Sequence, residues 1–493
     1  MRRLLAGWLA ALGLAAALTG CGPSTRPAQQ APGDSAAPTA QAAPPGGSPE
    51  SAAAISFTDD EGREIRLKKP CERMISLYAA HTENLYSLGA GDRVIGVHSA
   101  STYPPEAAFL PRFDYNADPE TVIAAQPDCV LIRPFITNKS PDFVRALENA
   151  GITVVSLYPE RLADFDGYIE ALALLTGTEE AAREELAAFH RNLEEISALT
   201  AGIEDRQRVF FESTEVNLRT VTADSMAGLA IEKAGGVNVA KDAEPTTPGS
   251  SIAVFGAERI LALADEIDVY VSQRGAMNAG GDLHSISIRP GFDTIKAVRE
   301  GRVYVLNEKL ISSPTFRYYK GVRELARCLY PERMDSLNGW DTDAPATKRD
   351  FANLIVRARH EQVYLPTSSK YYTETRKGHT FGLFADVDWR DPDFDAIETA
   401  VHLGSVGWER RDDKEYFDPG APVTREELAK AVFLLGDFPV EEAETPVADL
   451  EACENPNIVQ SLVDGGVFSL ADGRFEPDRP VTCGEVIAAL TAF

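Results

Sequence analysis

The chain has 493 residues, more than one ordinary hydrophobic core accommodates, so we expect two or three domains. Its composition, with 44% hydrophobic and 25% charged residues, is typical of a soluble globular protein. With 75 acidic against 48 basic residues, the formal net charge is −27. This excess of acidic residues disfavours a nucleic-acid partner, because binding to phosphates needs clustered Lys and Arg side chains.

The first 21 residues have the pattern of a secretory signal peptide, with Arg2 and Arg3 followed by a short run of Leu and Ala. That run is too short to span a bilayer comfortably. It ends in LTGC, which resembles a bacterial lipobox. The resemblance implies that the thiol of Cys21 is lipidated and anchors the protein to the membrane through two acyl chains. An ordinary signal peptide with an incidental cysteine is the alternative.

Residues 22–54 are rich in Ala, Pro, Gly, Ser and Gln and contain hardly any bulky apolar side chain. Such a segment buries too little surface to offset its ordering entropy, so we expect a disordered linker. The cysteines that follow include no C-x-x-C pair, which argues against a zinc site or a redox motif. Cys453 and Cys483 are candidates for a disulfide, although their spacing alone does not decide it.

From Ile55 on, short apolar runs alternate with segments that have helix signals. The runs 74–77, 94–97 and 129–132 are predicted strands, and so is ITVVSL, which begins at residue 152. Helices are predicted in HTENLYSLGAG, DPETVIAAQPD and PDFVRALENAG. Strands that alternate with helices indicate a parallel sheet in an α/β layer, which forms a first lobe over residues 55–175.

The segment 178–199 is predicted to form one long helix with Thr178 as its N-cap. Its apolar positions fall on one stripe: Leu186, Phe189, Leu193 and Ile196. At 1.5 Å per residue this helix is about 33 Å long, which is long for a connection within one domain. The alternation of strands and helices then resumes and predicts a second lobe over residues 206–330. We therefore expect an α/β fold of two Rossmann-like lobes joined by a long rigid helix.

Four segments follow one another in a recognisable order: ISLYAAHTENLYSLGAGDRVIGV, STYPPEA, DPETVIAAQPDCVLIRP and EKAGGVNVA. Together they resemble the class III periplasmic binding proteins, which are solute-binding lipoproteins of ABC importers for iron chelates, haem and cobalamin. The resemblance covers about residues 55–330. It implies a bilobal receptor without a permanently bound cofactor, which holds a small-molecule chelate in its cleft and passes it to a membrane permease.

The same family docks on its permease through one acidic residue on each lobe. Glu120 and Glu258 match these positions, because each precedes an apolar helix that leads into a strand. A carboxylate near a helix start is stabilised by the helix dipole and can form a bidentate pair with Arg. The alternative is that both are ordinary first-turn glutamates.

Ligands of α/β proteins meet the loops that follow the strands, which selects a set of polar loop residues. The candidates are His81, Thr82, Tyr103, Arg133, Arg274, His284 and Arg289. Arginines suit a ligand with carboxylate or catecholate groups, whereas His81 or Tyr103 would ligate haem iron. The similar cobalamin receptors carry aromatic residues where this chain has Ala100 and Arg133, which weakens a corrinoid interpretation. A ferric chelate is therefore the first expectation, and solvated loop side chains are the alternative.

Near its C-terminus the chain repeats itself. YFDPGAPVTREELAKAV and RFEPDRPVTCGEVIAAL align on Thr424 and Thr482, and a weaker copy, DAPATKRDFANLIV, aligns on Thr347. Self-similarity on this scale indicates repeated supersecondary units, here over about 335–365, 381–437 and 445–493. Each unit is predicted to end in a helix capped by its Thr, with a capping box where Glu follows three residues later.

This repeat resembles the S-layer homology (SLH) domain, whose signature the second copy carries at Phe384, Asp386, Val387, Phe417, Pro419, Thr424, Arg425 and Glu427. That family forms an α-helical bundle of three repeats and binds anionic cell-wall polysaccharide in grooves between them. On this resemblance Arg425, and Arg349 in the first copy, would bind an acidic sugar. The third copy has Cys483 where Arg is expected, so the alternative is an appendage whose wall binding has been lost.

The sequence carries no G-x-S-x-G, H-E-x-x-H, P-loop or G-x-G-x-x-G motif, so we do not expect an enzyme. We predict an extracytoplasmic lipoprotein receptor that binds an iron chelate, a siderophore or haem, delivers it to an ABC permease and is held to cell-wall polymer by its repeats. The first alternative is a cobalamin receptor of the same fold. The second is a structural or adhesive envelope protein without a transport role.

Overall fold

The computed structural model describes residues 55–492, with gaps at residues 248, 276, 277, 279, 364–378, 437 and 439–443. The proposed lipidation site Cys21 and the linker 22–54 lie outside the described residues. No helix of the described residues is long and apolar enough to cross a membrane.

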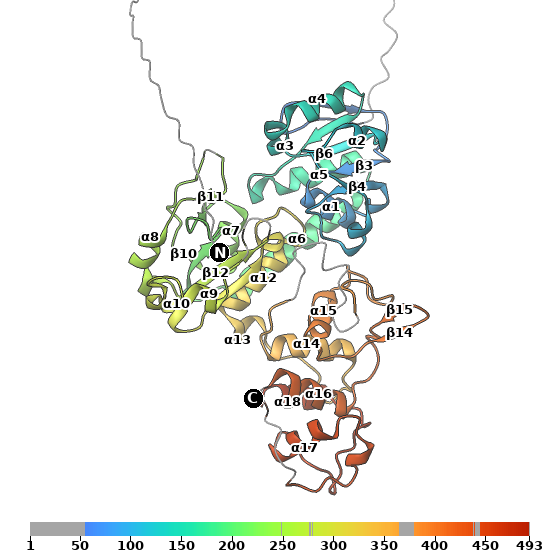
Figure 1. Cartoon of the computed structure of the whole chain (residues 1–493), viewed down its shortest axis with the longest axis vertical. Coiled ribbons are helices and arrows are strands. Elements are labelled where there is room, and N and C mark those ends of the chain that lie inside the picture. The colour runs from blue at the N-terminus through green and yellow to red at the C-terminus, as the bar shows by residue number, and fades with distance from the viewer. Residues whose placement is uncertain are drawn as a thin grey trace, which may run out of the picture. The chain divides into compact units, whose positions relative to one another are not determined.

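The first lobe is built on a parallel five-stranded sheet (Figure 1). Its strand order is β5-β4-β3-β6-β7. The bounds are β3 (Met74–Ser76), β4 (Val94–His98), β5 (Arg112–Phe113), β6 (Cys129–Ile132) and β7 (Thr153–Ser156). An antiparallel hairpin of β1 (Ile55–Thr58) and β2 (Glu64–Leu67) precedes the sheet. All four residues of β6 are buried, as expected for an apolar strand in the middle of a parallel sheet.

Five α-helices accompany this sheet: α1 (Ala79–Ser87), α2 (Glu120–Ala124), α3 (Pro134–Lys139), α4 (Pro141–Asn149) and α5 (Phe165–Thr176). The predictions for α1, α2 and α4 are confirmed, while α3 and α5 were not expected from the sequence. The helix α5 is followed by Gly177, which has a positive φ of 64° and provides the left-handed turn into the next helix.

The long helix is confirmed as α6 (Glu179–Thr200). Its predicted apolar stripe is buried along its whole length. Thr178 stands at the N-cap, but its side chain makes no capping hydrogen bond, because its hydroxyl bonds that of Thr176 at 2.8 Å. The stripe belongs to one hydrophobic core with α5 and with residues of the second lobe, so α6 is packed against both lobes rather than spanning a gap between them.

The second lobe has a parallel four-stranded sheet of order β10-β8-β12-β13. Its strands are β8 (Arg208–Glu212), β10 (Val237–Asn238), β12 (Val269–Arg274) and β13 (Val303–Asn307). A short antiparallel pair joins β9 (Thr220–Val221) to β11 (Ile252–Ala253). The helices are α7 (Met226–Lys233), α8 (Ala257–Ala262), α9 (Leu283–Ser287), α10 (Lys296–Arg299), α11 (Glu308–Ile311), α12 (Tyr318–Leu329) and α13 (Pro331–Met334). The expectation of two parallel α/β lobes is thus confirmed.

The residues from 335 on, here called the tail, are mainly helical. They contain α14 (Lys348–Ala358), α15 (Phe394–Leu403), α16 (Arg425–Leu435), α17 (Pro456–Asp464) and α18 (Cys483–Leu490), and a hairpin of β14 (Glu409–Arg411) with β15 (Lys414–Tyr416). Three of the helices start at a complete capping box: Thr347 with Asp350, Thr424 with Glu427 and Thr482 with Glu485. The repeated sequence therefore produces a repeated helix start, as its Thr-x-x-acid spacing predicts.

The three copies pair with one another in a closed ring. Isolated bridges join Thr347 to Pro422, Thr424 to Pro480, and Thr482 back to Pro345. The residue before each Thr lies in the middle of this ring and is buried: Ala346, Val423 and Val481. Their backbone hydrogen bonds run from copy to copy at 2.9 to 3.0 Å. Each copy thus supplies one side of a shared core.

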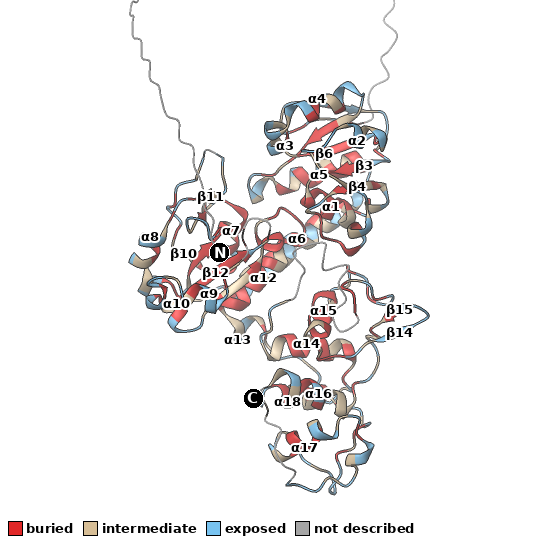
Figure 2. Ribbon diagram, viewed as in Figure 1, coloured by how far each residue is buried: buried red, intermediate tan, exposed pale blue. Residues whose placement is uncertain are grey.

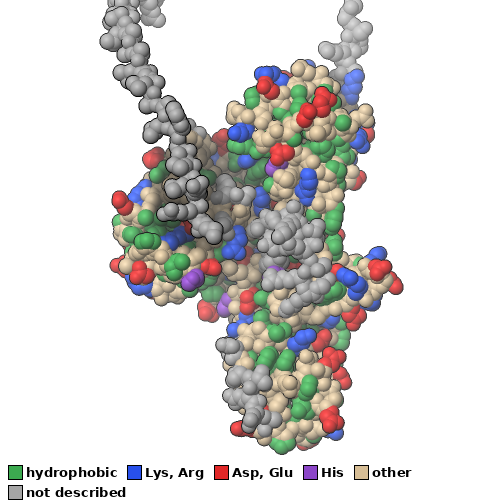
Figure 3. Space-filling view, viewed as in Figure 1, with side chains coloured by type: hydrophobic (Ala, Val, Ile, Leu, Met, Phe, Trp, Pro, Cys, Tyr) green, Lys and Arg blue, Asp and Glu red, His purple; other side chains and the backbone are tan. Residues whose placement is uncertain are grey.

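Buried residues concentrate on the two sheets and on the inward faces of the tail helices (Figure 2). On the face shown in Figure 3, acidic and basic side chains of the lobes are interspersed and basic residues form no large patch. The five cysteines among the described residues are buried free thiols, so Cys453 and Cys483 are not paired with each other.

Candidate functional site

A cleft of about 1210 Å³ is lined by residues of both lobes. Its first wall comes from the carboxyl ends of parallel strands, because Tyr78 follows β3, His98 ends β4 and Arg133 follows β6. The opposite wall is built in the same way from the second lobe: Ser213 follows β8 and Gln273 lies near the end of β12. The loops after strands therefore meet at one site, as expected for open α/β sheets.

Three aromatic rings surround Arg133 on the first wall. Its guanidinium carbon lies 4.7 Å from the ring centre of Tyr78, 4.8 Å from that of Phe135 and 5.8 Å from that of Tyr158. Burial raises the pKa of Tyr78 and of Tyr158, so both stay neutral phenols that can donate hydrogen bonds. This wall offers flat apolar faces and a cation at one place, which suits a large ligand with aromatic and anionic groups.

His98 adds a titratable group to the same wall. Its ring stacks on Tyr115 with centroids 5.5 Å apart, and its Nδ1 accepts the backbone N–H of Ala100 at 3.1 Å. Burial lowers its pKa, although Asp114, with a carboxylate oxygen 3.9 Å from Nε2, acts in the opposite direction. The imidazole is therefore mainly neutral at pH 7.

The polar groups of the second wall are hydroxyls and amides, one ammonium and the carboxylate of Glu308. The hydroxyl of Ser312 donates to Oε1 of Gln273 at 2.7 Å, and the amide nitrogen of Gln273 donates to the carbonyl of Ser213 at 2.9 Å. Gln273 is thus held in one orientation. Lys309 lies in the same wall and is 9% exposed, with Nζ 3.9 Å from the carboxylate of its neighbour Glu308.

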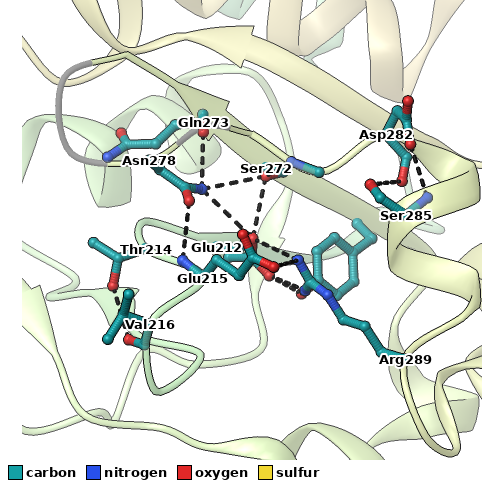
Figure 4. A network of polar contacts seen from close by, with 12 residues as sticks. Glu212, Thr214, Glu215, Val216, Ser272, Gln273, Asn278, Asp282, Ser285 and Arg289 are labelled. Atoms are coloured by element: carbon teal, nitrogen blue, oxygen red, sulfur yellow. Dashed lines mark hydrogen bonds and ion pairs between the residues drawn. The ribbon is translucent and has the colours of Figure 1, made fainter. Parts of the chain in front are cut away.

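A buried polar network lies directly behind this wall (Figure 4). Glu212, the last residue of β8, is fully buried and pairs with Arg289. Its carboxylate also accepts hydrogen bonds from Tyr270 at 2.6 Å and Ser272 at 3.3 Å. Asn278 links the network to the next loop by accepting the backbone N–H of Glu215 at 3.0 Å. A buried carboxylate needs such partners, and here they fix the loops that form the second wall.

Of the seven candidate ligand residues, only Arg133 lines the cleft. His81 and Thr82 lie inside α1 and are fully buried, which corrects the expectation that they are loop residues. The ring of His81 hydrogen-bonds the carbonyl of Leu157 at 2.9 Å, and burial lowers its pKa to about 4. The hydroxyl of Thr82 donates to Ser76 at 2.8 Å. Both therefore support the first wall from behind.

The other candidate ligand residues also lie outside the cleft lining. Tyr103 is buried and its hydroxyl donates to the carbonyl of Trp389 in the tail at 3.3 Å. Arg289 pairs with Glu212 in the network, and Arg274 and His284 are exposed residues outside the cleft lining. The residues that the sequence missed are Tyr78, His98, Tyr158 and Lys309. All four follow or end a strand, which is the signal that could have identified them.

Glu120 and Glu258 occupy equivalent places on the two lobes. Each lies in the first turn of its helix, α2 or α8, and each is exposed. Neither carboxylate forms an ion pair with another described residue. This geometry leaves both carboxylates available to a partner.

The tail contains a second groove, of about 630 Å³. Lys348, Trp408 and Lys430 line it, together with the acidic residues Glu426, Glu427, Glu454 and Asp478. Neither candidate arginine is part of the lining. Arg349 pairs with Asp391 and Asp393 at 2.7 Å, and these partners raise its pKa. Arg425 lies over the rings of Phe468 and Phe475 at 5.6 and 5.1 Å.

No group of three or more His, Cys, Asp and Glu side chains within the described part of the chain is arranged to hold a metal ion.

Residues 74–310 match the model of the family described as periplasmic binding protein. The matched segment contains both parallel sheets, α6 and most of the residues that line the cleft, while the tail lies outside it. The match covers slightly less than half of the chain, and it shows that the two lobes are similar to periplasmic binding proteins.

Several known proteins are similar to part of this chain. The chain is 27% identical to the uncharacterized ABC transporter substrate-binding lipoprotein YvrC of Bacillus subtilis over 284 residues, which cover 56% of this chain and 86% of that protein. It is 26% identical to the vitamin B12-binding protein of Vibrio cholerae over 263 residues, or 53% of this chain and 89% of that protein. A structure of a possible iron-binding periplasmic solute-binding protein from Staphylococcus epidermidis aligns with 25% identity and a TM-score of 0.47, covering 53% of this chain and 100% of that one.

Proposed function

We propose that this protein is an extracytoplasmic receptor that captures a chelate-sized ligand, an iron chelate or haem, and delivers it to an ABC-importer permease. The observation that carries the proposal is the cleft, in which Arg133 and three aromatic rings face the polar wall of the second lobe. Its volume of about 1210 Å³ exceeds the range of roughly 300–1,000 Å³ that is usual for small-molecule sites. The cleft thus suits a large ligand with aromatic and anionic groups.

Cobalamin is the second candidate, because a relative is named for binding vitamin B12. The full chain is titrated separately with haem, cyanocobalamin and a ferric catecholate siderophore. Binding is monitored by the change in tyrosine fluorescence. We expect one of them to bind, and Arg133→Ala to weaken that binding while Lys139→Ala, on the same lobe but outside the cleft, does not. Absence of binding by all three would favour a structural or adhesive envelope protein.

Delivery to the permease is proposed to use Glu120 and Glu258. Both carboxylates are exposed at helix starts on opposite lobes, where they can meet arginines of a partner. The double variant Glu120→Arg/Glu258→Arg should abolish import in cells and leave ligand affinity unchanged. Unchanged import would exclude this docking role.

The proposal also includes two ways in which the protein is attached to the cell envelope. The first is the lipid on Cys21, which metabolic labelling with a fatty acid and loss of the label in Cys21→Ser would test. The second is binding of the tail to an anionic wall polymer. Its groove offers Trp408 with Lys348 and Lys430, an aromatic face beside two cations.

Polymer binding is tested by pull-down on purified wall polymer. We expect Lys430→Glu to bind less, since Lys430 is an exposed residue of the groove. Arg425→Ala and Arg349→Ala test the two arginines selected from the sequence. Binding by all three variants as strong as by the unmodified protein would indicate that the tail is an appendage without this role.

A further inference from the structure

The helix α12 has two faces with different partners. Its apolar residues Val322, Leu325 and Leu329 belong to the hydrophobic core that includes α6. Lys320, Glu324 and Arg327 follow one another at spacings of 4 and 3, which places them on one stripe of the helix. Their side chains are only 19%, 11% and 9% exposed. A stripe of charges on a surface helix is normally solvated, so its burial requires an explanation.

The tail covers this stripe. Lys320 forms an ion pair with Asp395 of α15. Arg327 donates to the carbonyl of Val356 in α14 at 3.0 Å. Glu324 accepts the backbone N–H of Val363 at 3.3 Å. Helices of the first and second copies therefore both rest on α12.

The same part of the tail also contacts the first lobe. Arg390 donates to the carbonyl of Tyr86 in α1 at 3.0 Å. The ring of Trp389 lies against that of Tyr103, with centroids 5.5 Å apart. Gly382 approaches Pro105 so closely that a Cβ would stand 2.2 Å from its ring. The segment 381–395, here called the brace, therefore touches both lobes.

The two lobes themselves meet beside the brace. Arg317, just before α12, pairs with Glu83 of α1 at 2.8 Å. Its guanidinium also lies 3.4 Å from the ring centre of Tyr103, the tyrosine that binds the tail. Because buried charges are stable only with their partners in place, this junction has one favourable arrangement.

We propose that the brace fixes the angle between the two lobes, so that the width of the cleft depends on the tail. Linked lobes move relative to each other unless a substantial interface prevents it. Here a change of the interlobe angle would break either the ion pair between Lys320 and Asp395 or the contacts of Trp389 and Arg390 with the first lobe. The tail would then control the geometry of the cleft in addition to attaching the receptor to the cell wall. The inference rests on contacts alone and is independent of the ligand.

The experiment measures the distance between the lobes in the full chain. Nitroxide labels are attached to cysteines introduced at two exposed positions, Lys139→Cys and Lys241→Cys, in a Cys21→Ser background. The five native cysteines of the described residues are buried and should react slowly. Electron-electron double resonance then gives the distribution of interlobe distances. We expect one narrow distribution for the otherwise unmodified chain.

Two variants break the brace from opposite sides. Lys320→Glu puts two carboxylates together at the second lobe, and Arg390→Ala removes a contact with the first lobe. Each should broaden the distance distribution and shift its mean. The charge exchange Lys320→Glu/Asp395→Lys should restore the narrow distribution. Lys233→Glu, an equal charge change at an exposed site on α7, is the matched control and should have no effect.

Circular dichroism and gel filtration establish that each variant is folded. Should Lys320→Glu fail to fold, Arg390→Ala decides the question, because its side chain is half exposed and the change removes no buried ion pair. It removes the hydrogen bond to Tyr86, the contact with the ring of Trp389 and an exposed ion pair with Asp388. A distribution that stays narrow in the folded variants would overturn the proposal. Equal broadening in Lys233→Glu would overturn it too, since the effect would then not depend on the brace.

Discussion

The two walls of the cleft are supported from behind in opposite ways. Behind the first wall lies His81, whose ring contacts Tyr78 edge to face at 5.1 Å and bonds the carbonyl of Leu157. Its Nδ1 has no hydrogen-bond partner among the described residues, so the group is kept neutral by burial. Behind the second wall, Glu212 and Arg289 form an ion pair. His81 behind the first wall is thus a neutral support, whereas the support behind the second wall is an ion pair.

This difference explains how each wall can fail. The neutral support is lost when His81 is protonated at low pH. An ionic support is lost when one partner is removed and the other remains as an unpaired buried charge. The first wall should therefore respond to pH and the second to mutation of its pair.

The largest effect is expected for Arg289→Ala. This change leaves the fully buried carboxylate of Glu212 without its cation, which should destabilise the second lobe by about 3–5 kcal/mol. Urea denaturation followed by circular dichroism measures the loss. Lys233→Ala, on the same lobe without an ion pair among the described residues, should change stability by less than about 0.5 kcal/mol. Equal effects of the two variants would mean that the pair does not support the wall.

A somewhat smaller effect concerns pH and His81. Its folded pKa of about 4 lies below the value of 6.5 for an ordinary histidine, mainly because of burial. Between these values the unfolded chain binds a proton that the folded chain does not, so stability falls as the pH falls from 6.5 towards 4. The total loss should be about 3 kcal/mol.

Denaturation midpoints of the unmodified protein and of His81→Gln, measured from pH 7 to pH 4, isolate this contribution. The neutral amide of Gln does not titrate, so the stability difference between the two proteins should shrink or reverse as the pH falls. A difference that stays constant over this range would show that His81 takes up its proton as easily when folded as when unfolded.

The third prediction concerns the first wall itself. Arg133→Ala should weaken binding of an anionic chelate by about 1.5–3 kcal/mol, the usual contribution of a hydrogen bond to a charged group. Folding stability should hardly change, because the guanidinium sits among rings at the edge of the cleft and is not needed to neutralise a buried carboxylate. Isothermal titration with the ligand found above measures the affinity. A large loss of stability would assign Arg133 a structural role instead.

The smallest effect is expected for Gln273→Ala on the second wall. It removes one neutral amide whose oxygen accepts from Ser312, so ligand affinity should fall by about 0.5–1.5 kcal/mol. The comparison with Arg133→Ala in the same titration tests whether the first wall contributes more to binding. A greater loss for Gln273→Ala would reverse the proposed roles of the walls.

Local patterns in the sequence were enough for many elements of the fold, although not for α3 and α5. The run at 129–132 is apolar throughout and forms a buried strand, and the stripe that contains Leu186 and Phe189 is the buried face of α6. The three Thr-x-x-acid spacings give three capped helices. In each case the pattern and the structure involve residues only a few positions apart.

The candidate site was less predictable because side-chain partners come from distant segments. Nothing near Arg289 in the sequence indicates that Glu212, the last residue of β8, will pair with it. Tyr103 was expected at the ligand but contacts Trp389 in the tail. His81 comes just after a strand, yet α1 begins at Ala79 and turns its side chain into the core. Of the seven candidates chosen from the sequence, only Arg133, which follows β6 directly, lies in the cleft lining.

The closed pairing of the three tail copies also governs the order of events during synthesis. The bridge partner of Pro345 is Thr482. The first copy therefore cannot complete its pairing in the ring until the third copy has been synthesised and has left the ribosome. The lobes, encoded ahead of all three copies, can collapse earlier, since domains generally fold as units during translation. A nascent chain that stalls within the tail would therefore present finished lobes beside an unclosed ring with exposed apolar residues, a natural target for chaperones.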